Sequence, residues 1–111
     1  MNDLIELVQE SLRDGSLVSN PHLCAEYRSR LSGEYSYLVG QVEDIKLRKP
    51  SLWLELRKNN KSDTATEKEY GATPDGLKEK QFEANIKRVE KMMQGLNSLI
   101  KLSEGEAINQ Y

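Results

Sequence analysis

The feature that most constrains this chain is an unbroken heptad pattern of apolar residues in its last third. Between positions 82 and 107 the apolar and small residues are separated by steps that alternate between 4 and 3. The members are Phe82, Ile86, Val89, Met93, Leu96 and Ile100, followed by the small residues Ser103 and Ala107. Such spacing places one apolar stripe along a helix. Because an apolar stripe is unfavourable in water, we expect another helix to cover it.

A second heptad pattern lies in the first half of the chain and offers that cover. Cys24, Leu31, Leu38 and Ile45 are each separated by 7 residues, and Tyr35 and Val42 interleave with them. Asn20 followed by Pro21 is typical of a helix N-cap and first helical position. The pattern therefore predicts a long helix over 21–58, and Pro50 predicts a kink near residue 50.

Capping and turn signals predict three further helices. A short amphipathic helix is expected over 3–13 and should end at Gly15. Ser62 or Asp63 is suited to capping a short helix over 63–70, and Thr73 followed by Pro74 is suited to beginning a long helix over 74–108.

Together these elements predict an all-α fold and a single helical domain over 1–111. The two long helices should form an antiparallel hairpin with their heptad seams facing each other, closed either within one chain or between chains. Tyr27, Tyr37, Leu47 and Leu99 fall off the seams, and Met92 is suited to facing a partner. We therefore expect a homo-oligomer in which two hairpins form a helical bundle.

Composition and cysteine content favour a protein of the cell interior. The single Cys24 cannot form an internal disulfide, which is consistent with a reducing compartment. No apolar run approaches the length of a membrane helix, and the N-terminus does not resemble a signal peptide. His22 and Cys24 are too few for a metal site, so we expect no catalytic residues, metal or cofactor.

Charge is distributed unevenly, and the middle of the chain is basic. Residues 1–45 carry 3 basic and 8 acidic side chains, whereas residues 46–91 carry 12 basic and 8 acidic ones. We call the densest part the basic corner, and its members are Lys46, Arg48, Lys49, Trp53, Arg57, Lys58 and Lys61. Cations around an exposed aromatic suit single-stranded DNA. The same residues also suit a protein partner or a solvated surface, with Trp53 as a core anchor.

Part of the sequence resembles a family of small bacteriophage helical proteins whose genes lie among replication and recombination genes. The resemblance covers residues 25–111. It rests on Leu52-Trp53-Leu54-Glu55-Leu56-Arg57, Lys61-Ser62-Asp63, Glu67, Ala72-Thr73, Gly76 and the ending Glu104-Gly105-Glu106-Ala107-Ile108-Asn109-Gln110-Tyr111. It implies a phage-encoded accessory factor for DNA metabolism in the bacterial host cytoplasm, and it supplies no active-site residues.

These observations favour a non-enzymatic accessory protein that presents the basic corner to DNA or to a DNA-processing protein. The alternatives are a module that inhibits a host enzyme, including a defence enzyme, and a component of virion assembly or scaffolding. All of these functions require an interaction surface, and none requires catalysis. The basic corner is the part of the sequence that is best suited to be that surface.

Overall fold

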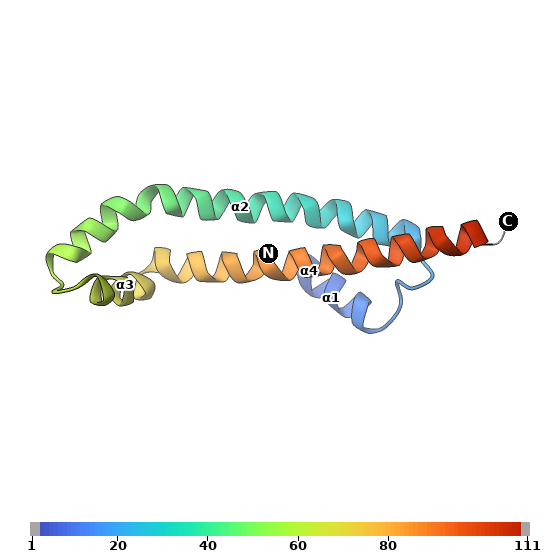
Figure 1. Cartoon of the computed structure of the whole chain (residues 1–111), viewed down its shortest axis with the longest axis horizontal. Coiled ribbons are helices and arrows are strands. Elements are labelled where there is room, and N and C mark those ends of the chain that lie inside the picture. The colour runs from blue at the N-terminus through green and yellow to red at the C-terminus, as the bar shows by residue number, and fades with distance from the viewer. Residues whose placement is uncertain (1–2, 110–111) are drawn as a thin grey trace. The chain divides into compact units, whose positions relative to one another are not determined.

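The computed structural model of the chain is all-helical and describes residues 3–109, with side chains over residues 3–105 (Figure 1). Its four helices are α1 (Asp3–Arg13), α2 (Pro21–Lys58), α3 (Asp63–Ala72) and α4 (Pro74–Asn109), and this part of the chain contains no strand. The expected helix ends agree to within two residues. Part of the heptad pattern depends on the side chain of Ala107, and part of the resemblance depends on residues 110–111. Both lie outside the described part of the chain.

The ends of the helices are fixed by the capping residues that the sequence suggests. The Asn20 side chain accepts a hydrogen bond from the Leu23 amide at 3.2 Å. Ser62 Oγ accepts one from the Ala65 amide at 3.1 Å. Gly15, after α1, has φ of 76°, a left-handed conformation that favours glycine. Side-chain oxygens thus satisfy amide groups that have no partner inside a helix.

The long helices α2 and α4 form an antiparallel hairpin and contribute to two compact units. Unit 1 contains residues up to 36 and from 87 onward, and unit 2 contains residues 37–86. In unit 1, Arg28 donates to Asn97 at 3.0 Å and the Tyr35 hydroxyl to Glu90 at 3.4 Å.

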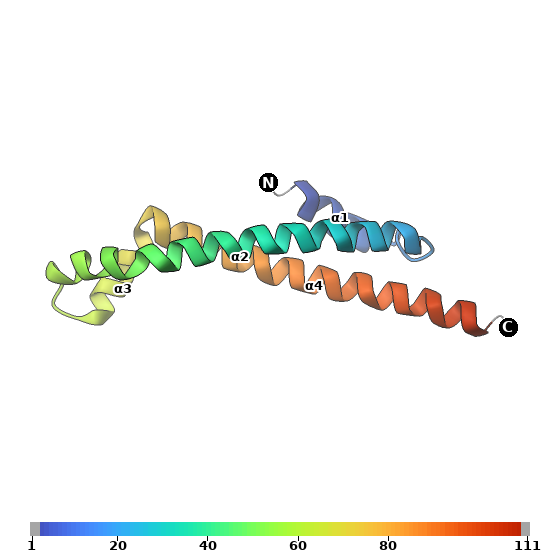
Figure 2. The same ribbon diagram turned by 90° about the horizontal axis from the view of Figure 1, so that it is seen from above.

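In unit 2, the Lys46 ammonium lies 4.0 Å from a Glu83 carboxylate oxygen, and Arg48 lies 3.2 Å from Asp75. In both units, residues later in α2 contact residues earlier in α4, as expected for two helices that run in opposite directions. Each unit therefore contains its own antiparallel pairing of α2 with α4, and Figure 2 shows the unit 1 part of α4 beside α2.

The core of unit 1 is built from three helices. Its buried apolar residues are Ile5, Val8, Leu17, Cys24, Tyr27, Leu31, Val89, Met92 and Leu96. Helix α1 packs against α4, because Arg88 donates a hydrogen bond to Gln9 at 2.6 Å and the Leu12 methyl groups lie over Gly95. This contact gives the short α1 the packing that it needs, since an isolated helix of its length is marginal in water.

The buried face of α4 is rotated from the predicted seam. Val89 and Leu96 are fully buried, as expected, but Met92 is buried where Met93 was predicted, and Met93 is only half-buried. The other predicted seam residues of α4, namely Phe82, Ile86 and Ile100, are also half-buried. In unit 1, α4 packs against α1 as well as α2, so its buried face includes the side that α1 covers.

Two residues assigned to a partner-facing surface are thereby placed in the core. Met92 retains only 7% of its exposed surface, and Tyr27 only 8%. On α2, three of the four predicted seam residues are buried, namely Leu31, Leu38 and Val42, and Tyr35 is half-buried, as several seam residues of α4 are. Self-association stays a prediction, which light scattering of the purified protein tests directly.

Unit 2 has a smaller core with a polar content. Leu38, Val42 and Ile45 come from α2, and Thr66 and Tyr70 come from α3. Helix α2 continues without interruption through Pro50, and Figure 1 shows it bending over its last turns. A bend is the expected consequence of proline, which removes one backbone hydrogen bond and crowds the preceding turn.

Asn85 of α4 is the other buried polar residue of unit 2. Its side chain is 5% exposed, and no described residue accepts a hydrogen bond from its Nδ2 atom. A buried donor without an acceptor costs about 1–3 kcal/mol. In helical bundles, one polar residue at a core position restricts how helices pair.

We expect Asn85→Leu to raise the free energy of unfolding by about 1 kcal/mol, because leucine removes the buried donor at similar volume. Urea unfolding followed by circular dichroism measures the change. Gln81→Leu, at an exposed site on the same helix, is the control and should stay within about 0.5 kcal/mol of the wild type. A loss of stability in Asn85→Leu would show that the amide is satisfied.

Among residues 3–109 no helix combines the length and apolar character that a membrane-spanning segment needs.

Candidate functional site

The basic corner lies in unit 2, where the last turns of α2 meet α3 and the start of α4. Most of its members have an acidic or aromatic partner within the chain. The ion pairs are Lys46 with Glu83, Arg48 with Asp75, Arg57 with Asp63 and Lys58 with Glu55. The corner therefore carries far less free positive charge than its sequence suggests, and it connects α2 to its neighbours.

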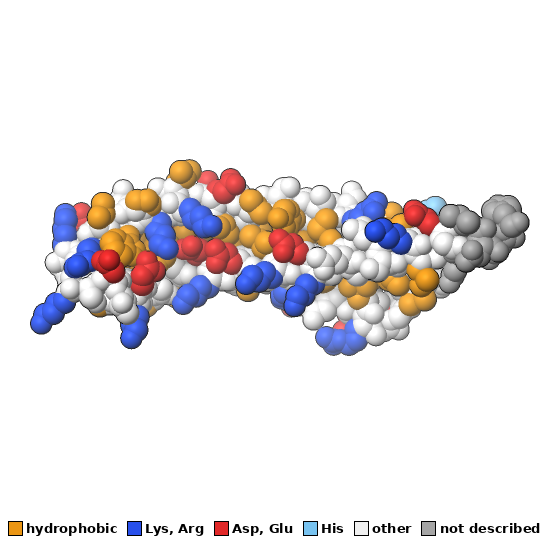
Figure 3. Space-filling model, viewed as in Figure 1, with side chains coloured by type: hydrophobic (Ala, Val, Ile, Leu, Met, Phe, Trp, Pro, Cys, Tyr) orange, Lys and Arg blue, Asp and Glu red, His pale blue; other side chains and the backbone are white. Residues whose placement is uncertain are grey.

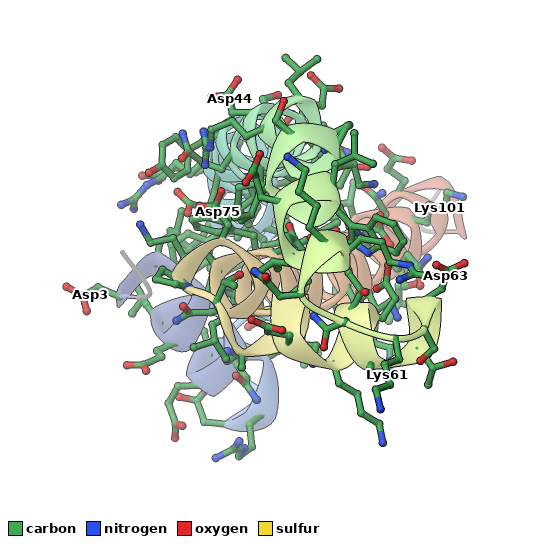
Figure 4. The ribbon with its side chains drawn as sticks, turned by 90° about the vertical axis from the view of Figure 1, so that its left-hand side faces the viewer. Asp3, Asp44, Lys61, Asp63, Asp75 and Lys101 are labelled. Carbon is green, nitrogen blue, oxygen red and sulfur yellow. The ribbon has the colours of Figure 1, made fainter. Side chains whose placement is uncertain are left out.

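Arg48 makes the best-formed of these contacts. Its Nε and Nη2 atoms donate to the two carboxylate oxygens of Asp75, each at 3.2 Å. This two-point geometry is the strong form of an arginine–carboxylate pair. The hydrogen bonds from Arg48 hold the pKa of Asp75 below its usual range. The pair thus joins α2 to the first turn of α4, and Figure 4 shows Asp75 lying near the ribbon of α2.

Arg57 holds the loop between α2 and α3. Its guanidinium group donates to the Asp63 carboxylate at 2.9 Å and to the Asn60 backbone oxygen at 2.6 Å. Asn60 in turn donates through Nδ2 to the Leu56 backbone oxygen and to the Glu69 carboxylate. Both arginines of the corner are therefore engaged in contacts inside unit 2, and a phosphate would compete with those contacts.

Trp53 and Lys49 connect α2 to α3. The indole Nε1 of Trp53 donates to Glu67 at 2.8 Å, so the half-buried ring has a fixed edge. The Lys49 ammonium lies 4.7 Å from the centre of the Tyr70 ring, a cation–π distance. Trp53 is therefore a partly exposed residue held by α3.

The remaining cations are the most exposed ones. Lys58 pairs with Glu55 on the same helix, but both side chains are 71% exposed, so the pair contributes little. Lys61 is exposed, and no acidic group described here lies within ion-pair distance of it. Figure 4 shows Lys61 projecting away from the helices. Lys58 and Lys61 are therefore open to other contacts, as are Lys46, whose pair with Glu83 is long and exposed, and Lys49, whose neighbour is the Tyr70 ring.

Tyr70 of α3, the ring beside Lys49 of the basic corner, has a strongly raised pKa. The ring is 3% exposed, and its hydroxyl donates to Glu79 at 2.8 Å. Burial raises the pKa of Tyr70, and the hydrogen bond to Glu79 raises it further. A raised pKa in the folded state means that the folded chain retains the proton more strongly than the unfolded chain does.

The stabilisation from Tyr70 is therefore fully present below about pH 10, the ordinary tyrosine value, and is lost as the pH rises through the folded pKa. We expect the free energy of unfolding to fall more steeply above about pH 10 in the wild type than in Tyr70→Phe, which has no phenol to ionise. Urea unfolding at several pH values measures both slopes. Equal slopes would contradict the burial of this hydroxyl.

An apolar groove lies beside Trp53 and was not anticipated from the sequence. This corner groove has a volume of about 450 Å³ and is lined by Lys46, Lys49, Pro50, Trp53, Leu54 and Glu67. Half of its lining residues are apolar or aromatic, and the others are two lysines and one glutamate. Figure 3 shows apolar and charged side chains interleaved over this part of unit 2.

Two leucines of α2 are unusually exposed, and one of them, Leu54, lines the corner groove. Leu47 keeps 80% of its surface in contact with solvent, and Leu54 keeps 61%. They are 7 residues apart on α2, with Pro50 between them, so they lie on one face of the helix. The sequence already indicated that Leu47 could be exposed, because Leu47 lies outside the heptad seam.

A second hollow of about 420 Å³ lies between α3 and α4, and its lining includes Tyr70, Gly71, Glu79 and Lys80. Acidic and basic groups are mixed there, and nothing in its lining selects one ligand charge.

The remaining chemical candidates of the sequence do not form a reactive site. His22 is exposed, whereas Cys24 is buried and donates through Sγ to the Leu17 carbonyl oxygen at 3.4 Å. Burial raises the pKa of the Cys24 thiol, which disfavours the nucleophilic thiolate. Within the described residues, no three histidine, cysteine, aspartate or glutamate side chains are grouped as metal ligands.

The comparisons with known proteins leave the resemblance to bacteriophage proteins as a prediction. No protein-family model, curated protein or solved structure matches this chain.

Proposed function

We propose that this chain is a non-enzymatic accessory protein that binds a protein partner through unit 2, and that the partner acts in DNA processing. The observation that carries the proposal is the exposure of Leu47 and Leu54 on one face of α2, with Leu54 also lining the corner groove. Exposed apolar side chains grouped around a concave, partly aromatic surface are typical of protein-binding sites.

The ion pairs of the basic corner favour a protein over DNA as the partner. Binding of DNA gains free energy when cations replace the counterions of phosphate groups. Arg48 and Arg57 are engaged by Asp75 and Asp63, so a phosphate would have to displace a carboxylate from each. Leucine side chains exposed at this site have no favourable contact to make with phosphates.

The DNA-processing context of the proposal comes from the resemblance to bacteriophage proteins. Under that proposal the chain acts in the cytoplasm of a bacterial host, next to proteins of replication or recombination. The alternative roles use the same surface with another partner: inhibition of a host enzyme, or assembly of the virion. The identity of the partner decides among these roles.

A quantitative pull-down tests the proposal. Affinity-tagged intact protein is expressed in bacteria that carry the phage genes, and co-purifying proteins are measured by mass spectrometry. The variant Leu47→Gln/Leu54→Gln changes two exposed side chains of the corner, and Leu102→Gln, which changes a side chain 53% exposed in unit 1, is the control. We expect the corner variant to lose a DNA-processing partner by at least about tenfold, and the control to retain it.

Retention of that partner by the corner variant would contradict the proposal. A gel-shift assay with single-stranded DNA at low salt covers the nucleic-acid alternative. We expect no shift; a shift that weakens steeply with salt and is lost in Lys58→Gln/Lys61→Gln would instead support direct DNA binding.

A further inference from the structure

We infer that the corner groove binds an acidic segment of the partner that inserts one large apolar side chain beside Trp53. The inference rests on the proposed function and adds the chemistry of the bound segment. It comes from three properties of the groove: apolar lining residues, an indole ring with a fixed edge, and two lysines in the lining.

The apolar part of the groove lining suits an apolar anchor. Pro50, Trp53 and Leu54 provide the apolar part of its lining, and the groove holds about 450 Å³. The hydrogen bond from Trp53 Nε1 to Glu67 fixes one edge of the indole before any partner arrives. A site that is already ordered loses less conformational entropy on binding, which favours a side chain inserted against this ring.

The two lysines in the lining supply the preference for an acidic segment. Lys46 lies 4.0 Å from Glu83, with both side chains about half exposed, so this pair is weak and solvent-screened. Lys49 has an aromatic ring as its neighbour rather than a carboxylate. The carboxylate that lines the groove, Glu67, already accepts a hydrogen bond from Trp53. Both lysines can therefore meet carboxylates of an incoming segment.

Trp53 also provides the signal with which binding is measured. It is the single tryptophan of the chain, so its fluorescence reports the groove alone. An apolar side chain inserted beside the ring excludes water from it. We expect a shift of the Trp53 emission to shorter wavelength on binding.

Selection from a display library of random 12-residue peptides on the intact protein tests the inference. We expect the enriched peptides to share an aromatic residue or leucine flanked by aspartate or glutamate. The strongest synthetic peptide of this family should shift the Trp53 emission. Its affinity should fall at least about tenfold in Lys46→Gln/Lys49→Gln and stay unchanged in Lys101→Gln, a substitution of an exposed lysine in unit 1.

Enrichment without an acidic excess, or no enriched family at all, would overturn the inference. Equal affinity for the wild type and the groove-lysine variant would do so as well. A homodimer that dissociates in Leu54→Gln would show that a second copy occupies the groove, which also overturns it.

The pull-down separates failure of the inference from failure of the proposed function. A partner that depends on Leu47 and Leu54 but not on Lys46 and Lys49 leaves the proposed function standing and removes only the acidic segment. A partner that depends neither on the two leucines nor on the two lysines would contradict both the proposed function and the acidic segment.

Discussion

Replacing Leu96 with alanine should lower the free energy of unfolding by about 2–5 kcal/mol. Leu96 is fully buried in the core of unit 1 and belongs to the heptad pattern that the sequence displays most clearly. The substitution removes apolar contacts and leaves a cavity, and the core relaxes only partly around a cavity. Because small domains are stable by about 5–15 kcal/mol, the loss is a large share of the total.

Leu102→Ala provides the matched control on the same helix. The side chain of Leu102 is 53% exposed, so its truncation should change the free energy of unfolding by no more than about 0.5 kcal/mol. Urea unfolding followed by circular dichroism measures both variants. Equal losses at the two positions would mean that the buried face of α4 is not the one described here.

Replacing Gly76 with alanine should destabilise unit 2 by about 1–3 kcal/mol. A Cβ atom at this position would overlap the backbone oxygen of Tyr70 and lie 2.9 Å from the Cα atom of Gly71. The same Tyr70 oxygen accepts hydrogen bonds from the amide and hydroxyl groups of Thr73, the residue that caps α4. The added methyl group must therefore push backbone against backbone where α3 meets α4.

Gly40→Ala is the opposite case within the same unit. A Cβ atom at Gly40 meets nothing within 4 Å, and the residue lies inside α2. Alanine there should raise the free energy of unfolding by about 0.5–1 kcal/mol, because glycine loses more backbone entropy in a helix. A thermal unfolding series distinguishes the two substitutions by sign. Stabilisation by both alanines would show that α3 and α4 do not approach closely at Gly76.

Helix positions and hairpin pairing were predictable because they depend on local signals and apolar spacing. Each capping side chain, at Asn20, Ser62 and Thr73, accepts a hydrogen bond from the backbone amide three residues later. The centre of the buried face of α4 was less predictable. Met92 and Met93 are adjacent and chemically identical, so their burial depends on where α1 packs, and the heptad pattern holds no information about that contact.

The partners of the basic corner were beyond sequence reasoning for a similar reason. Arg48 is 27 residues from Asp75, and Trp53 is 14 residues from Glu67. A cluster of lysines and arginines is visible in the sequence, whereas three of the four carboxylates that pair with it come from other helices. The exposed pair Leu47 and Leu54 was partly visible, since Leu47 lies outside the predicted seam.

Cross-linking of cysteine pairs is the most direct test of the antiparallel hairpin. In a Cys24→Ala background, Arg28→Cys/Asn97→Cys probes unit 1 and Lys46→Cys/Glu83→Cys probes unit 2, because these residues are in contact. Arg28→Cys/Lys87→Cys is the control, since residue 87 lies ten residues, or about 15 Å, from residue 97 along α4.

Dilute protein is treated with a short bismaleimide, and mass spectrometry identifies which cysteines are cross-linked. We expect cross-links within single chains for both contact pairs and little cross-linking for the control pair. Cross-links that join two chains, or a control pair that reacts as efficiently as the contact pairs, would contradict that expectation.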